Sequence, residues 1–155
     1  MLFRSGLIVF GVAFSGSMFT NKSVKSSWYD CIKPKMTPPS FVFPIVWTTL
    51  YIFIAIAFAR TIGGGLAKNW LVIVLFLGNF ALNILWCWAY FGQKRIQLSF
   101  LLILLLAATI IALVFASRDW IVVLLLVPYL AWVSFATYLN YMSIEKEKEC
   151  IKHDS

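Results

Sequence analysis

Five long stretches of uncharged, mostly apolar residues constrain this chain more than any other feature of its sequence. Each approaches or exceeds the roughly 20 residues that a helix needs to cross a ~30 Å hydrocarbon core. Backbone groups in lipid must pair within their own segment, which requires helices rather than open strands. We therefore predict an all-α membrane protein, a bundle of five transmembrane helices that forms a single domain over residues 1–155. The expected helices cover about residues 5–21, 40–60, 69–92, 96–117 and 120–144.

Composition indicates a chain whose solvent is mostly lipid. Hydrophobic residues make up 62% of the sequence and charged residues 12%, about half the usual charged share. The net charge of +7 raises the question of nucleic acid. The basic residues, however, lie in short clusters between apolar stretches and form no continuous basic helix. We therefore expect membrane lipid, and no nucleic acid, as a partner.

A long loop over residues 22–39 separates the first two expected helices. It holds three of the five prolines, together with Trp28, Tyr29 and Ile32. Because a disordered linker rarely combines such residues, we expect an ordered loop that acts as a lid. The polar tail, 145–155, begins with alternating Glu and Lys, which predicts a solvated extension of the last helix.

The first stretch, 5–21, has a second interpretation. It is the shortest of the five and follows a single Arg4, so it also resembles the apolar region of a signal peptide. Its best cleavage motif, Ser15-Gly16-Ser17, is a weak substitute for Ala-x-Ala. We favour a membrane helix, and cleavage would leave four.

Lysine and arginine counts predict the orientation in the membrane. Five crossings place the first loop, the third loop and the C-terminal tail on one side, with nine basic residues against four on the other. The long first loop and the C-terminus are therefore predicted to be cytoplasmic. The absence of an Arg-rich amphipathic presequence fits a bacterial cell membrane or the mitochondrial outer membrane. The nine basic residues are Lys22, Lys25, Lys33, Lys35, Lys94, Arg95, Lys146, Lys148 and Lys152.

Histidine and cysteine give no sign of a metal centre. His153 is the only histidine, and Cys31, Cys87 and Cys150 show no CxxC spacing. We therefore expect no metal site, no cofactor and no disulfide framework. The expected spans also carry no Asp, Glu, Lys, Arg or His well inside them, whereas ion-coupled carriers and acid–base enzymes usually need such groups. Ligand binding is thus favoured over conventional catalysis.

Amides and aromatic rings are the polar groups that remain inside the expected helices. At 1.5 Å per residue, three groups of them lie at similar depths beneath the long loop. Flat aromatic walls with one or two amides suit a large, planar, apolar ligand. The groups, each on one helix face, are Asn79–Asn83–Trp86–Tyr90, Trp47–Tyr51 and Trp132–Ala136–Asn140.

Packing offers an alternative explanation for part of this pattern. Asn79 and Asn83 would then hydrogen-bond neighbouring helices. Trp28, Trp70 and Trp120 lie at span ends, where tryptophan commonly anchors a chain in the interface. A structural membrane protein without a ligand is therefore an alternative.

Sequence blocks between about Trp28 and Asn140 point to a known family. They are Trp28-Tyr29-Asp30, Lys33-Pro34, Thr37-Pro38-Pro39, the run Val42–Tyr51, Asn79 with Ala81-Leu82-Asn83 and Trp86, Phe91-Gly92-Gln93-Lys94-Arg95, and the run Val127–Asn140. In order and spacing these blocks resemble the translocator protein family (TspO/MBR, peripheral-type benzodiazepine receptor). The chain departs from the family at Met36, where a tryptophan usually precedes Thr-Pro-Pro.

The resemblance implies a membrane receptor or carrier with a pocket that the first loop closes. The implied ligands are porphyrins such as protoporphyrin IX and haem, synthetic isoquinoline carboxamides and benzodiazepine-type compounds, and in some members cholesterol. A homodimer is also implied. Carried over by position, the pocket residues are Tyr29, Pro38, Trp47, Tyr51, Asn83, Trp86, Tyr90, Trp132 and Ala136.

Two further properties follow from the resemblance. In some bacterial members, the pair that matches Trp47 and Trp132 is associated with light- and oxygen-dependent porphyrin breakdown, so a porphyrin-degrading activity is an alternative function. The loose cholesterol consensus of the family fits Leu139, Tyr141 and Lys146.

Overall fold

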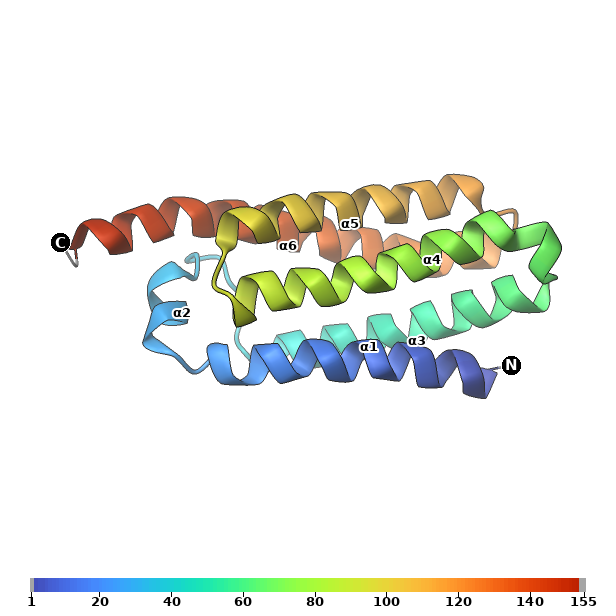
Figure 1. Ribbon diagram of the computed structural model, residues 1–155, viewed down its shortest axis with the longest axis horizontal. Helices are drawn as coiled ribbons and strands as arrows, with labels where there is room; N and C mark the ends of the chain where they lie inside the picture. Colours follow the sequence, from blue (N-terminus) through green and yellow to red (C-terminus); the bar gives the residue numbers. More distant parts are fainter. Residues whose placement is uncertain (1, 154–155) are drawn as a thin grey trace.

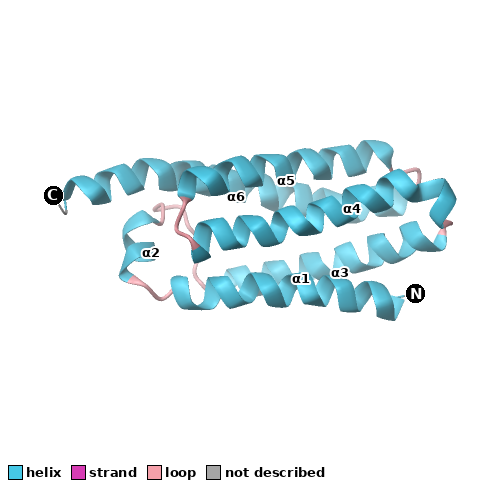
Figure 2. Ribbon diagram, viewed as in Figure 1, coloured by secondary structure: helices cyan, strands magenta, loops and turns pink. Residues whose placement is uncertain are grey.

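The computed structural model describes residues 2–153, which are almost entirely helical and contain no strand. Five long helices lie side by side, and the short helix α2 lies at one end of the bundle (Figures 1 and 2). The N-terminus lies at the opposite end, and α6 runs past the bundle on the α2 side. The elements are α1 (Leu2–Ser23), α2 (Ser27–Ile32), α3 (Val42–Gly63), α4 (Leu66–Cys87), the π-helical turn η1 (Trp88–Gly92), α5 (Ile96–Ala116) and α6 (Trp120–His153).

Five of the described helices are long and apolar enough to cross a membrane, which confirms the predicted all-α bundle. Leu106 and Ile110 are fully buried, whereas Phe10, Leu104 and Leu124 on the outer surface are exposed. Helices that are apolar on all sides fit a lipid environment and would be unusual in a small soluble bundle. The candidate spans are Phe3–Thr20, Val42–Gly63, Leu66–Gly92, Ile96–Ala116 and Trp120–Lys152.

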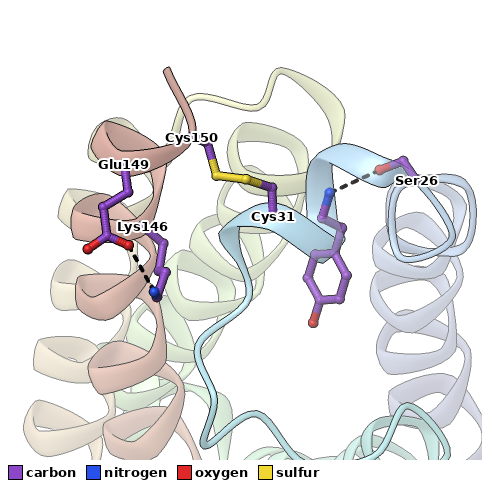
Figure 3. The surroundings of a disulfide bond; sticks show 6 residues. Ser26, Cys31, Lys146, Glu149 and Cys150 are labelled. Carbon is purple, nitrogen blue, oxygen red and sulfur yellow. Dashed lines mark hydrogen bonds and ion pairs between the residues drawn. A yellow bond between two sulfur atoms is a disulfide. The ribbon is translucent and has the colours of Figure 1, made fainter. Parts of the chain in front are cut away.

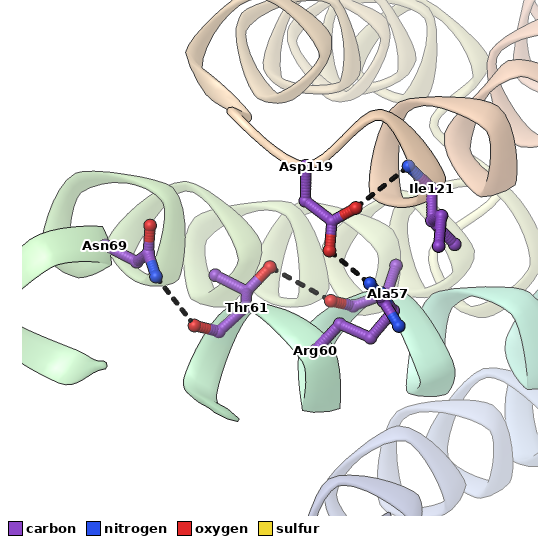
Figure 4. Close-up of polar contacts among 6 residues, drawn as sticks. All are labelled: Ala57, Arg60, Thr61, Asn69, Asp119 and Ile121. Carbon is purple, nitrogen blue, oxygen red and sulfur yellow. Dashed lines mark hydrogen bonds and ion pairs between the residues drawn. The ribbon is translucent and has the colours of Figure 1, made fainter. Parts of the chain in front are cut away.

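Polar contacts organise the end of the bundle away from α2 (Figure 4). Asn69 Nδ2 donates to the carbonyl of Thr61 in the last turn of α3 (3.0 Å). Arg60 Nε donates to Asp119 Oδ2 (2.8 Å), and Asp119 Oδ1 accepts from the Ile121 N–H (2.9 Å). Asp119 is thus the N-cap of α6 and ties it to α3. The hydrogen bond from Arg60 lowers the pKa of Asp119 below its ordinary value.

Asn79 joins α4 to two neighbouring helices inside the apolar core. Its Nδ2 donates to Thr109 Oγ1 on α5 (2.8 Å), and its Oδ1 accepts from the Tyr129 hydroxyl on α6 (2.9 Å). These contacts confirm the packing interpretation of Asn79.

Asn140 makes a second junction nearer the α2 end. Its Oδ1 accepts from Trp86 Nε1 on α4 (3.1 Å) and from Ser99 Oγ on α5 (3.0 Å), and its Nδ2 donates to the Ile96 carbonyl (3.2 Å). An apolar helix gains little from packing against one neighbouring helix rather than another, because lipid tails are equally apolar. Hydrogen bonds between helices therefore help to fix the helix register.

The loop between α1 and α3 is more structured than its sequence indicates. Helix α1 continues through Ser23, and the Ser26 side chain caps α2 by accepting from the Tyr29 N–H (3.3 Å). This cap orients α2 so that Tyr29 and Ile32 are buried. At the other terminus, α6 continues to His153, which confirms the helical extension. Residues 154 and 155 lie outside the described part of the chain.

The expectation of no disulfide is wrong. Cys31 on α2 and Cys150 on α6 form one, with 6.3 Å between their Cα atoms, as Figure 3 shows. Cys87 is a buried free thiol. The two bonded cysteines are 119 residues apart, and only the packing of α2 against the α6 extension brings them together. Sequence spacing therefore carries no signal of the bond.

Replacing Asn140 with Leu should destabilise the bundle by about 2 kcal/mol, because the change removes three hydrogen bonds and leaves the buried Trp86 indole N–H without an acceptor. Reversible unfolding in mixed micelles measures this loss. Thr137→Val is the matched control on the same helix, since the Thr137 hydroxyl bonds only the Val133 carbonyl of its own helix. Equal effects of the two substitutions would contradict the assignment.

The Asp119 carboxylate should make stability depend on pH. Its folded-state pKa lies below its unfolded value, so its contribution is present above the unfolded pKa and is lost as pH falls through the folded pKa. Asp119→Asn keeps the capping oxygen and removes the ion pair. Between pH 6 and pH 3 the melting temperature of the wild type should fall toward that of the variant, and a constant difference over this range would refute the proposed linkage.

Candidate ligand pocket

A small cavity lies beneath α2, where the long loop folds over the bundle. Its volume is about 40 Å³, enough for roughly one or two water molecules. Four of the nine predicted pocket residues line it, namely Tyr29, Trp86, Tyr90 and Ala136. The other lining residues are Pro34, Thr37, Phe43, Phe91, Leu139 and Asn140.

Trp47 and Tyr51 on α3 extend the aromatic wall of this cavity toward the membrane interior. The Trp47 ring lies 5.5 Å from the Tyr51 ring and 6.1 Å from the Trp86 ring, at interplanar angles of 30° and 34°. Trp86 in turn lies 6.2 Å from Tyr90. Four rings from α3, α4 and η1 are thus in one chain of contacts. The structure brings together these residues, which the sequence grouped by helix face and depth.

Most polar atoms of this wall are already hydrogen-bonded within the fold. The Trp86 indole donates to Asn140, and the Tyr90 hydroxyl lies 2.9 Å from Ser143 Oγ on α6. These bonds hold both rings in fixed orientations. Trp86 and Tyr90 therefore present ring faces, rather than hydrogen-bond donors, to whatever enters the cavity.

Two buried polar atoms near the cavity and its wall lack a hydrogen-bond partner in the described part of the chain: Thr37 Oγ1 and Asn83 Nδ2. Trp132 Nε1, which lies elsewhere, also lacks one. Asn83 Oδ1 accepts from the Tyr51 hydroxyl (3.1 Å). The Tyr129 hydroxyl also faces the Asn83 side chain, but its contact with Nδ2 falls short of hydrogen-bond geometry. Buried donors without acceptors are costly, and a ligand with acceptor atoms would satisfy them.

Trp132 lies in a different place from the other predicted residues. It lines a groove of about 460 Å³ between α3 and α6, together with Ile45 and Pro128. Ile45 is 61% exposed, so the groove opens on the outer surface of the bundle. The ring of Phe43 lies 5.8 Å from the Trp132 ring and also lines the small cavity. Phe43 thus forms part of the wall between cavity and groove.

Pro38 and two of the three residues of the cholesterol consensus do not line the cavity. Pro38 is half-buried in the loop and lines neither the cavity nor the groove. Within the cholesterol consensus, Leu139 is buried and lines the cavity, whereas Tyr141 is 49% exposed. Lys146 forms an ion pair with Glu149 (2.8 Å). Leu139 and Tyr141 therefore lie on different faces of α6.

Two lysines lie near the residues that line the cavity. Lys94 Nζ lies 5.3 Å from the centre of the Trp28 ring, and Lys33 forms an ion pair with Asp30 (3.2 Å). Burial, and to a smaller extent the charge of Asp30, raise the pKa of Tyr29. The Tyr29 phenol is therefore neutral at physiological pH and available as a hydrogen-bond donor.

Phe43, Phe91 and Thr37 line the cavity, although the sequence analysis did not name them as pocket residues. Phe43 precedes Trp47 by four residues, and this helical spacing was a usable signal. Phe91 lines the cavity from the π-turn η1, which no sequence pattern indicated. Thr37 lies in irregular loop structure, whose course depends on tertiary contacts.

Comparison with known proteins agrees with this architecture. The model of the TspO/MBR family matches residues 5–144. The chain is 41% identical to the tryptophan-rich protein TspO of Chlorobaculum tepidum, over 86% of this chain and 87% of that protein. It is 37% identical to protein CrtK of Rhodobacter capsulatus, over 74% and 75%, and 34% identical to the human translocator protein, over 83% and 79%. Because the match covers nearly all of a five-span bundle, the chain is an integral membrane protein that belongs to the TspO/MBR family.

Proposed function

We propose that this protein is a membrane receptor or carrier that binds porphyrins and related planar, apolar ligands beneath α2. Two observations carry the proposal: the Trp47 and Trp86 rings are in contact, 6.1 Å apart and tilted by 34°, and Asn83 Nδ2 has no hydrogen-bond partner among the described residues. Flat indole faces suit a flat conjugated ligand, and the amide supplies a polar contact that orients it. Isoquinoline carboxamides and benzodiazepine-type compounds combine the same features and are proposed as further ligands.

Binding requires the site to open. Pockets for ligands of this size measure roughly 300–1,000 Å³, whereas the cavity beneath α2 holds about 40 Å³. The helices around it are joined by hydrogen bonds, whereas its cover is a short helix and a loop. We therefore propose that α2 and the following loop move outward to admit a ligand. Rotation of Phe43 would join the cavity to the groove at Trp132.

The charges at the α2 end favour an acidic ligand. Lys33, Lys35, Lys94 and Arg95 are exposed there, and they would attract the propionates of a porphyrin through long-range electrostatics. We also propose that this end faces the cytoplasm, as the positive-inside rule predicts. We also propose that the protein forms a homodimer, as the family resemblance implies.

Trp47→Phe should weaken the binding of protoporphyrin IX roughly fivefold, because phenylalanine offers a smaller ring face for stacking. Titration followed by the Soret absorbance of the porphyrin measures the affinity without relying on tryptophan fluorescence. Trp70→Phe is the matched control, since Trp70 lies near the other end of the bundle and is 62% exposed. Equal affinities for both variants would remove Trp47 from the site.

A second candidate function, light-dependent porphyrin breakdown, is favoured by the continuous ring contacts from Tyr51 through Trp47 and Trp86 to Tyr90. An excited porphyrin can oxidise an adjacent indole, and neighbouring rings can share the resulting charge. Illumination in the presence of oxygen should then bleach the Soret band faster in wild type than in the double variant Trp47→Phe, Trp86→Phe. The same bleaching rate in both proteins, at equal porphyrin occupancy, would exclude this function.

A further inference from the structure

The disulfide between Cys31 and Cys150 joins the cover of the cavity to its frame. Cys31 is on α2, and Cys150 is near the end of α6, beside the Lys146–Glu149 ion pair (Figure 3). The 34 residues of α6 measure about 51 Å, so the helix extends beyond a ~30 Å hydrocarbon core. Its extension gives α2 a fixed attachment point outside the membrane.

Without the disulfide, α2 would be held only by its packing and its two flanking loops. A helix of six residues is far shorter than the 12–15 residues at which isolated helices become marginally stable. Tyr29 and Ile32 pack in a small cluster with Tyr90 and Ile96, which is separate from the main core of the bundle. Few buried contacts therefore hold α2 in place, and the disulfide adds a strong constraint on its position.

The disulfide lies at the surface of the protein. Cys31 is exposed and Cys150 is half-buried, whereas Cys87 is fully buried. The Cα separation of 6.3 Å lies within the range of ordinary disulfides, so the bond forms without backbone rearrangement. The pair can therefore be reduced and reformed with α2 in place.

We propose that Cys31 and Cys150 form a redox latch on the cover of the cavity. The disulfide holds α2 against α6 and keeps the cavity closed, and the dithiol lets α2 and residues 33–41 move outward. The role of the latch in ligand entry rests on the function proposed above, whereas its effect on α2 does not.

Thiol–disulfide exchange with a cellular dithiol supplies the chemistry. A thiolate of the dithiol attacks the more exposed sulfur, that of Cys31, and Cys150 leaves as a thiolate that takes up a proton. The second thiol of the reductant then attacks the mixed disulfide and releases Cys31, and the reductant becomes a disulfide. Two electrons and two protons pass to the protein, and reaction with a disulfide oxidant reverses both steps.

The compartment sets the resting state of the latch. Thiol pools keep cysteines reduced in the cytoplasm, while disulfides persist outside it. With the α2 end in the cytoplasm, the latch is open at rest and closes under oxidative conditions. An oxidising compartment on that side would reverse the resting state and leave the mechanism unchanged.

Hydrogen–deuterium exchange tests the latch without a ligand. In the oxidised protein, the amides of Asp30 and Lys33 are bonded to Ser26 O and Tyr29 O and should exchange slowly. Reduction by a water-soluble phosphine should accelerate their exchange at least tenfold. Cys31→Ser and Cys150→Ser should each exchange rapidly with or without the reductant, and amides in the middle of α5 should not change in any sample.

Two results would overturn the proposal. One is exchange in α2 that changes less than twofold on reduction, when mass spectrometry shows that the disulfide has been reduced. The other is a failure of the two cysteines to form a disulfide under oxidant, shown by alkylation of all accessible thiols.

Ligand kinetics separate the latch from the proposed function. Association of protoporphyrin IX should be about tenfold faster with reduced than with oxidised wild type, and equally fast with Cys150→Ser under both conditions. Absence of porphyrin binding in either redox state would refute the proposed function, while the exchange measurement would still decide whether the latch exists. Equal association rates in both states, with binding intact, would refute its role in ligand entry.

Discussion

Hydrogen bonding of the backbone in lipid is the constraint on which this structure depends. It forces each apolar stretch into a helix, and it leaves helices that are apolar on every side. Because lipid tails match such surfaces as well as a neighbouring helix does, the hydrophobic effect contributes little to the choice of partner. The few buried polar contacts then have a large share in fixing the arrangement. Asn79 and Asn140 join α4 to α5 and α6 at two depths.

The same hydrogen bonds between helices also position the candidate site. Asn140 holds the Trp86 indole by its nitrogen, so the face of the ring is left to contact Trp47 across the interface with α3. The same bundle that excludes charged groups from its interior thus offers stacking surfaces and one incompletely satisfied amide. Such a site is suited to binding a planar molecule and poorly suited to acid–base chemistry. The proposed movement of α2 would supply the volume that the closed cavity lacks.

Much of this architecture could be predicted from the sequence because its signals are local. The absence of charged residues identified the membrane spans. Helical spacing placed Asn83, Trp86 and Tyr90 on one face of the expected helix 69–92, which the structure divides into α4 and η1. The other features depend on contacts between distant segments. The Cys31–Cys150 bond needs α2 to reach the extension of α6, and η1 has no sequence signature. Trp132 shares a helix face with Ala136, yet a half-buried position beside Phe43 places it in the outer groove rather than in the cavity.

The proposed binding site is tested most directly by a structure of the protein with protoporphyrin IX bound. We expect the macrocycle beneath α2 against the indole faces of Trp47 and Trp86, with a ligand atom within hydrogen-bond distance of Asn83 Nδ2. A macrocycle bound only in the outer groove between α3 and α6, with the contacts among Trp47, Tyr51 and Trp86 unchanged, would contradict it.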